Sequence, residues 1–313
     1  MQSVRSIPAR ILTILLLLAP ILSACGAAGS GSGDTGGKKP TALTSFYPLY
    51  FLTTSIAGDR FAVRNLVPAG AEPHDWEPST RDMAALRDAA LFVYNGAGLD
   101  AWAPRAIAAS RSTRRVDVEA TQGLPLAPPE GEEAANYPSD PHAWLDPLLF
   151  KQMAAKVADG LTRADPAGKE TYAANLAALQ RRLDDLDQAY ASGLRDCARR
   201  EIITSHAAFG YLARRYGLEQ IALEGVSPDA EPTPARLAEV ARIARERGAT
   251  YIYFETLVSP KVAETLAHEV GAQTLVLDPL EGLDEKGGQG GKEDYVSVMT
   301  ANLANLRTGL GCR

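Results

Sequence analysis

The chain has 313 residues, with 32 Lys and Arg against 38 Asp and Glu, which gives a formal net charge of −6. This acidic balance, with no cluster of basic residues, argues against nucleic acid as a partner. The length is enough for one large or two small domains after a leader is set aside.

The first 24 residues have the pattern of a secretory signal peptide. Arg5 and Arg10 precede the apolar run ILTILLLLAPI of residues 11–21, which is short for a membrane span. The next residues, Leu-Ser-Ala-Cys25, resemble the bacterial lipobox, which predicts that Cys25 is the lipidated first residue of the mature protein. An ordinary cleaved signal with an incidental cysteine is the alternative. Residues 25–40 are rich in Gly and Ser, and we expect them to form a flexible tether. The protein is then expected outside the cytoplasm, anchored to the membrane through the lipid on Cys25.

Short β-rich runs alternate with helical patterns in two sets, which predicts an α/β fold with two Rossmann-like lobes and parallel sheets. The first lobe is expected over residues 41–164, with strands at 42–46, 61–67, 91–94 and 115–118 and a helix at 80–89. The second lobe is expected over residues 197–313, with strands at 202–204, 220–223, 251–254 and 274–277. Its helices are expected at 207–216, 234–247, 260–270 and near 294–306.

A long helix is predicted between the lobes, over residues 165–196. Asp165 suits the N-cap and Pro166 the first turn. Apolar residues then recur every three or four positions, which predicts one buried stripe along one face. Its members are Tyr172, Leu176, Leu179, Leu183, Leu186, Tyr190 and Leu194. We interpret this helix as a rigid spine joining the lobes; a coiled-coil dimerisation helix is the competing interpretation, and we expect a monomer.

Two cysteines remain if Cys25 carries lipid. Cys197 and Cys312 are an even pair, and in an oxidising compartment they are expected to form a disulfide. Two unrelated free thiols are the alternative.

Three of the four histidines lie in comparable positions. His74 lies in a turn-rich loop after the second strand, His142 in a loop before a helix, and His206 at the end of a strand. Asp278 also ends a strand, and in open α/β sheets ligands bind beyond the carboxyl ends of the strands. Because imidazole suits Zn²⁺ and three nitrogens with one oxygen is an ordinary zinc environment, these four residues are candidate metal ligands. His268 lies inside a helical pattern and is expected at the surface.

Several segments resemble those of the zinc/manganese solute-binding lipoproteins of bacterial ABC importers. They are FYPLY (46–50), NLVPAGAEPHDWEPS (65–79), DPHAWLDP (140–147), TSHAAFGY (204–211), FET (254–256) and LDPL (277–280). The resemblance covers nearly all of residues 41–310, and its two Pro-His segments are the most specific. It implies a metal held in the cleft between two lobes bridged by a rigid helix, with His74, His142, His206 and Asp278 at the four ligand positions.

The same resemblance implies Zn²⁺ capture for an importer made of a permease and an ATPase. The third ligand position is His in zinc-type members and Glu in many manganese-type ones, and His206 occupies it here. A Mn²⁺-binding importer component and a metal-dependent adhesin are alternatives within the family. A metallohydrolase is an alternative from another class, although no HExxH helix is present and four protein ligands would close the site to water.

Residues around the ligands have expected supporting roles. Ligating imidazoles usually donate their second N–H to a carboxylate or carbonyl, and Glu72, Asp75, Asp146 and Glu255 are the candidates. Glu255, at a strand end, is the strongest of them and a reserve ligand. Trp76 and Trp144 are expected to pack beneath the loops. Many zinc-type members carry a His-rich loop before the second ligand, whereas residues 128–140 here are acidic and contain no His. We expect a solvated loop, and a weak acidic collector of cations near the cleft is the alternative.

Overall fold

The first half of the chain folds around a four-stranded parallel sheet in a computed structural model, which describes residues 39–129, 137–228, 232–282 and 294–313. The strands are β1 (Thr41–Thr44), β2 (Ala62–Asn65), β3 (Leu91–Tyr94) and β4 (Val116–Glu119), in the order β2-β1-β3-β4. Thr41 pairs with Ala62, and Leu91 with Val116. The predicted signal peptide, Cys25 and nearly all of the tether lie outside the described residues, as do residues 130–136 of the acidic loop.

Both faces of this sheet are covered by helices. Ala42 of β1 belongs to a core cluster shared with α1 (Tyr47–Ala57) and α4 (Pro147–Ala164). The next residue, Leu43, packs on the opposite side with α2 (Thr80–Asp88) and α3 (Ala103–Ala109). This alternation follows from the two-residue period of a strand. Because both faces of the sheet are buried, β3 consists almost wholly of apolar residues.

The second half contains two pairs of parallel strands. β5 (Glu201–Thr204) pairs with β6 (Glu219–Ala222), and β7 (Tyr251–Phe254) pairs with β8 (Gln273–Val276). Strand β5 lies close to β7. Helices α6 (Gly210–Tyr216), α7 (Pro234–Arg247), α8 (Lys261–Val270) and α10 (Tyr295–Leu310) complete this half. The fold is therefore α/β with parallel sheets in both halves, as the sequence predicted.

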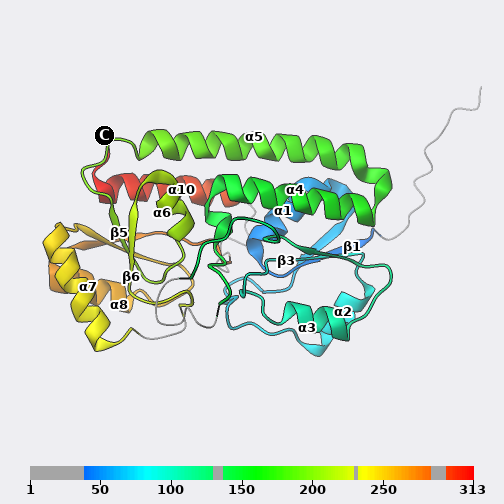
Figure 1. The fold of residues 1–313 in the computed structure, drawn as a ribbon, viewed down its shortest axis with the longest axis horizontal. Helices are drawn as coiled ribbons and strands as arrows, with labels where there is room; N and C mark the ends of the chain where they lie inside the picture. Colours follow the sequence, from blue (N-terminus) through cyan, green and yellow to red (C-terminus); the bar gives the residue numbers. More distant parts are fainter. Residues whose placement is uncertain (1–38, 130–136, 229–231, 283–293) are drawn as a thin grey trace, which may run out of the picture. The chain divides into compact units, whose positions relative to one another are not determined.

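A long helix, α5 (Lys169–Gly193), links the halves and lies over α1, α4 and α10 (Figure 1). Its predicted stripe is buried apart from Leu176, which is partly buried. The helical stretch begins at Pro166, as predicted, with a 3₁₀ turn (Pro166–Gly168) that α5 continues from Lys169. Asp165 caps no α5 backbone group; its carboxylate accepts hydrogen bonds from Arg60 and Tyr172 instead.

The predicted elements are all present, and β3, β7 and α7 have their predicted bounds. Helix α6 begins later than predicted because Ala207–Phe209 form a turn. Residues Lys39–Arg313 form one compact unit whose main core cluster draws on both halves. The division into lobes at residues 164/165 and 196/197 therefore stays a prediction.

The ends of the second half are joined covalently. Cys197, just after α5, forms a disulfide with Cys312, just after α10, which confirms the predicted pair.

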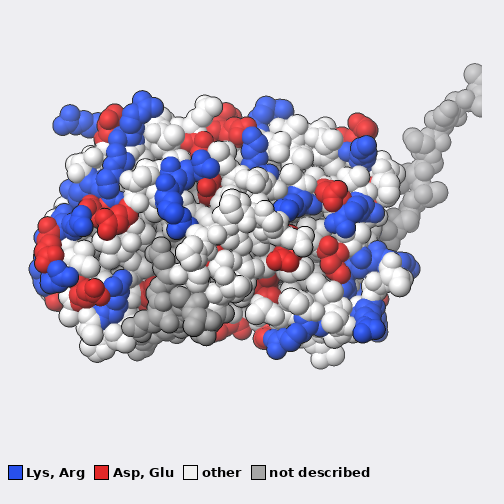
Figure 2. All heavy atoms as spheres, viewed as in Figure 1, with Lys and Arg blue, Asp and Glu red and all other residues white. Residues whose placement is uncertain are grey.

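The face drawn in Figure 2 mixes acidic and basic side chains without a region of one sign. Among the described residues, no helix combines the length and the apolar character that crossing a membrane requires.

Candidate metal centre

Three histidine rings converge on one carboxylate in the interior of the protein. The Nε2 atoms of His74, His142 and His206 lie 3.3, 3.2 and 3.2 Å from Oε1 of Glu281. Four potential ligand atoms, one from each residue, all lie within 4.8 Å of one another. The four side chains are at most 1% exposed, so the group is closed to bulk solvent.

Each member of this group comes from a segment that follows or precedes a regular element. His74 lies in the irregular stretch between β2 and α2, and His142 directly precedes the 3₁₀ turn Ala143–Leu145 that leads into α4. His206 is the second residue after β5. Glu281 lies in the segment after β8, where the chain turns at Leu280 with φ of 60°. Two members thus come from each half of the chain.

The second nitrogen of each ring also has a partner. His142 Nδ1 lies 2.8 Å from Asp140 Oδ1, and His206 Nδ1 lies 2.7 Å from Glu255 Oε1. His74 Nδ1 lies 3.0 Å from the Tyr137 hydroxyl. Such partners fix the orientation of a ring and the nitrogen that it presents to a metal. All three rings therefore present Nε2 to the centre of the group.

Asp278 is not brought into this group. Its carboxylate instead accepts hydrogen bonds from the Leu280 backbone N–H (2.7 Å) and the Thr256 hydroxyl (2.9 Å). Burial raises its pKa to about 6, although both hydrogen bonds oppose the rise. The acidic position in the group is held by Glu281, three residues further along the chain, which the sequence analysis did not single out.

Of the other candidate supporting residues, Glu72 contacts a histidine of the group, whereas Asp75 and Asp146 have other positions or roles. Glu72 Oε1 accepts from the backbone N–H of His74 (3.3 Å), and its Oε2 is buried without a hydrogen-bond partner. Burial, reinforced by nearby Glu281, raises the pKa of Glu72 to about 9. Asp75 is exposed. Asp146 caps α4 and pairs with Arg215.

Trp76 and Trp144, each two residues after a histidine of the group, both pack against other parts of the protein. Trp144 is fully buried and donates its ring N–H to the Pro279 carbonyl (2.7 Å), two residues before Glu281. Trp76 makes an edge contact with Trp102, with ring centroids 5.2 Å apart. His268 is exposed on α8, as predicted.

The charges within the group are strongly coupled. Burial alone would lower the pKa of His206, but Glu255 and Glu281 hold that pKa well above its usual value. Burial also opposes protonation of His142, yet Asp140 and Glu281 raise its pKa. Burial lowers the pKa of His74. For Glu281, the three histidines outweigh burial and hold its pKa well below its usual value.

This donor set suits a bound metal ion. Three imidazole nitrogens and one carboxylate oxygen are ligand types that Zn²⁺ takes in four-coordinate sites. Imidazole-rich sets favour Zn²⁺ relative to Mn²⁺, which prefers more oxygen ligands. The arrangement can therefore bind a divalent cation through protein atoms alone.

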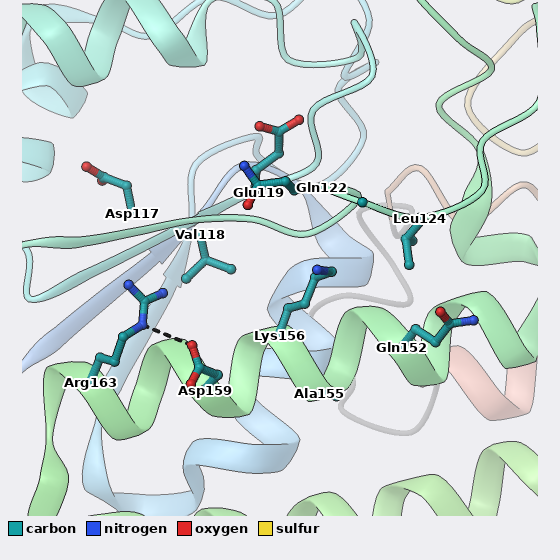
Figure 3. A pocket seen from close by; sticks show the side chains of 11 residues that line it. Asp117, Val118, Glu119, Gln122, Leu124, Gln152, Ala155, Lys156, Asp159 and Arg163 are labelled. Carbon is teal, nitrogen blue, oxygen red and sulfur yellow. Dashed lines mark hydrogen bonds and ion pairs between the residues drawn. The ribbon is translucent and has the colours of Figure 1, made fainter.

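A separate hollow of about 520 Å³ lies between β4 and α4 (Figure 3). Its charged side chains have both signs, and Arg163 there pairs with Asp159 at 3.0 Å. The residues that line it include no histidine or cysteine. It offers no donor set comparable to the histidine group.

Sequence reasoning missed three contributors to the site: Glu281, Asp140 and Tyr137. Asp140 and Tyr137 lie five residues or fewer before His142, in the segment that the sequence analysis described as an acidic loop. A carboxylate two residues before a candidate ligand is a usable signal, because a side chain at that position reaches the ligand's own backbone N–H. Tyr137 and Glu281 had no comparable local signal.

Comparisons with known proteins give a consistent result. The family model described as zinc-uptake complex component A, periplasmic, matches residues 43–309. The high-affinity zinc uptake system protein ZnuA of Bacillus subtilis (strain 168) is 39% identical over 300 residues, which cover 93% of this chain and 94% of that protein.

Two further comparisons concern one protein of Streptococcus pneumoniae. Its zinc-binding lipoprotein AdcA (strain ATCC BAA-255 / R6) is 39% identical over 303 residues, and the match covers 94% of this chain but 60% of that lipoprotein. The crystal structure of the Zn(II)-bound ZnuA-like domain of AdcA is similar with a TM-score of 0.76 and 40% identity. That similarity covers 87% of this chain and 99% of the domain.

Proposed function

Since this chain belongs to the family of the periplasmic zinc-uptake complex component A, we propose that it captures Zn²⁺ outside the cytoplasm and delivers it to an ABC importer. The members of this family are the substrate-binding components of transport systems and are not enzymes. Its importers comprise a membrane permease and an ATPase, which are the partners we assign to this chain.

The observation that carries the proposal is the convergence of three Nε2 atoms on Glu281 Oε1, at 3.2 to 3.3 Å, in a closed interior. We assign His74, His142, His206 and Glu281 as the Zn²⁺ ligands. The Zn(II)-bound relative with 40% identity supports zinc as the cargo. Four protein ligands leave no coordination position for a reacting water, which is the arrangement of a carrier.

The decisive experiment compares Glu281→Gln with Asp278→Asn by zinc titration calorimetry. Glu281→Gln removes an anionic ligand, and we expect zinc affinity to fall well over tenfold. Asp278→Asn removes a carboxylate that bonds to the Leu280 N–H and the Thr256 hydroxyl but to none of the four assigned ligands, and we expect little change in affinity. The opposite pattern would move the fourth ligand to Asp278.

Metal choice is tested by His206→Glu. The change replaces a borderline nitrogen donor with a hard anionic oxygen donor, so the affinity ratio of Zn²⁺ to Mn²⁺ should fall. Zinc can still bind more tightly in absolute terms, because the Irving–Williams order favours it at most mixed sites. An unchanged or increased ratio at one pH would show that His206 does not set the metal preference.

For the anchor, we propose a lipid on Cys25, which lies outside the described residues. The name of the Streptococcus relative, a zinc-binding lipoprotein, supports this assignment. Labelled palmitate should enter the full chain in a bacterial host and should not enter Cys25→Ser. We propose that the mature protein is a monomer, which light scattering on a version without the lipid would test.

A further inference from the structure

The hydroxyl of Tyr211, on α6, joins two points that lie far from it in sequence. It accepts a hydrogen bond from the Ala127 backbone N–H (2.9 Å) and donates one to the Asp140 carbonyl (2.8 Å). Ala127 and Asp140 also bond directly, from the Asp140 N–H to the Ala127 carbonyl (2.9 Å). These three residues form a closed triangle of hydrogen bonds, which we call the Tyr211 clasp.

The clasp lies against one of the assigned ligands. Asp140 Oδ1 accepts from the backbone N–H of His142 (3.0 Å) and lies 2.8 Å from its ring Nδ1. Asp140 is 5% exposed and His142 is fully buried, so neither has water as an alternative partner. Whatever fixes the backbone of Asp140 therefore also fixes the ring of His142.

Helix α6 is shaped to receive Asp140. A Cβ atom at Gly210 would lie 3.1 Å from Asp140 Oδ2, so the glycine permits a close approach there. The Arg214 guanidinium lies 3.9 Å from Asp140 Oδ2 and stacks over the Tyr211 ring at 4.8 Å. Tyr211 and Arg214 of one helix thus contact Asp140 from the other half of the chain, and Gly210 leaves room for it.

The same helix begins four residues after His206, and the turn Ala207–Phe209 connects them. One short segment therefore supplies a ligand at one end and holds the support of a second ligand at the other. His206 and His142 lie with Nε2 atoms 3.4 Å apart, so their separation depends on this segment.

We infer that Tyr211 is a positioning residue of the zinc site, which acts through Asp140 to hold His142 in its metal-binding orientation. The inference rests on the proposed function. Tyr211 contacts no ligand atom itself, and its contribution is to preorganise the site. Without its hydroxyl, the Ala127 N–H loses its acceptor, Asp140 loses one of two fixed backbone partners, and His142 gains freedom to turn away from the metal.

The test is Tyr211→Phe, which removes one oxygen and keeps the buried ring. Removal of an outer partner of a ligand costs roughly 10–100-fold in metal affinity. Tyr211 acts one step further out, so we expect zinc to dissociate about three- to tenfold faster. The matched control is Tyr216→Phe, on the same helix, whose hydroxyl bonds to Asp187 of α5 and not to the clasp.

A double-mutant cycle separates positioning from general stability. Asp140→Ala removes the clamp on His142, and adding Tyr211→Phe to it should leave the dissociation rate nearly unchanged. Thermal unfolding of the metal-free variants reports any general loss of stability. In both tyrosine variants that loss should be similar.

Three outcomes decide the matter. Faster zinc loss in Tyr211→Phe alone, absent in the Asp140→Ala background, supports the inference. Wild-type rates in Tyr211→Phe, or equal acceleration in Tyr216→Phe, would overturn it while wild-type zinc binding leaves the proposed function standing. Failure of the wild-type chain to bind zinc would overturn both.

Discussion

The histidines of the metal centre are held in two different ways. His142 and His206 each have a carboxylate that contacts both the ring Nδ1 and the backbone N–H of the same residue. His74 has separate partners, the Tyr137 hydroxyl for its ring and Glu72 for its backbone. His142 and His206 are therefore each held at two points by a carboxylate of their own, whereas the ring of His74 has a neutral partner.

The difference follows the local structure. His142 and His206 lie one residue from a 3₁₀ turn and two residues from a strand, respectively, whereas His74 lies in the middle of an irregular connection between β2 and α2. Asp140 lies two residues before His142, and Glu255 directly follows β7 and faces His206, so each carboxylate reaches one histidine's backbone N–H and ring together. His142 and His206 are therefore preorganised by charge, and His74 by packing and a single hydroxyl.

The largest expected effect distinguishes the two kinds of ligand directly. His206→Ala should lower zinc affinity by well over tenfold, and by more than His74→Ala does. The reason is that His206→Ala also leaves the buried Glu255 carboxylate without its ring partner, whereas His74→Ala exposes only a neutral hydroxyl. Calorimetry on both variants measures the difference. His268→Ala, on the surface of α8, should match the wild type. An equal loss from the two site variants would show that the charged partner of His206 adds nothing to zinc affinity.

The pH dependence should also follow the clamped histidines. Because Glu255 and Glu281 hold the pKa of His206 above its usual value, the metal-free site keeps a proton there that zinc must displace. Zinc affinity should therefore fall as the pH drops through that raised pKa and level off above it. Glu255→Gln lowers the pKa of His206, so the fall should move to lower pH.

Calorimetry in buffers of different ionisation enthalpy counts the protons released on binding. Glu255→Gln should release fewer protons at neutral pH than the wild type. Tyr137→Phe should leave the count unchanged, because His74 already has a lowered pKa. A count that does not respond to Glu255→Gln would mean that this carboxylate does not tune His206.

Tyr137→Phe itself should have a smaller effect on zinc affinity, of less than about tenfold. A neutral hydrogen bond is roughly half as strong as a charge-assisted one, and the phenyl ring retains the packing. Glu255→Gln, measured alongside at a pH where His206 is neutral, should cost roughly 10–100-fold. If Tyr137→Phe costs as much, the neutral partner matters as much as the charged one.

The smallest expected effect on the site comes from the disulfide. The Cys197→Ser/Cys312→Ser variant should bind zinc like the wild type, because no ligand or ligand partner contacts either cysteine among the described residues. Its free energy of unfolding should fall by about 2–4 kcal/mol, since the crosslink closes a loop of 115 residues. Chemical denaturation measures the change, and a loss of zinc affinity would link the crosslink to the site.

Much of this structure follows from local patterns. Strict alternation of helical and strand segments, the stripe along α5 and the isolated positions of three histidines all carry their information in short windows of sequence. His74, His142 and His206 could be found because three of the four histidines lie in comparable positions, at a strand end or in a loop beside a regular element, whereas any one of them alone would have been weak evidence.

The fourth position could not be found in this way. The rule that ligands lie at strand ends pointed to Asp278, directly after the strand run. Asp278 precedes a proline and bonds to the backbone two residues on, which is the usual behaviour of Asp in a turn. The turn at Leu280, with the Pro279 carbonyl held by Trp144, directs Glu281 inward. That outcome depends on contacts between residues 135 positions apart.

The disulfide also gives the second half a distinct covalent topology. Residues 197–312 form a closed ring, with His206 and Glu281 on it and with His74 and His142 on the linear part of the chain that precedes it. A single protease cut anywhere in the ring would yield two new termini but still one molecule. The two ring-borne metal ligands would stay covalently connected after such a cut, whereas a cut between residues 74 and 142 would separate His74 from the rest.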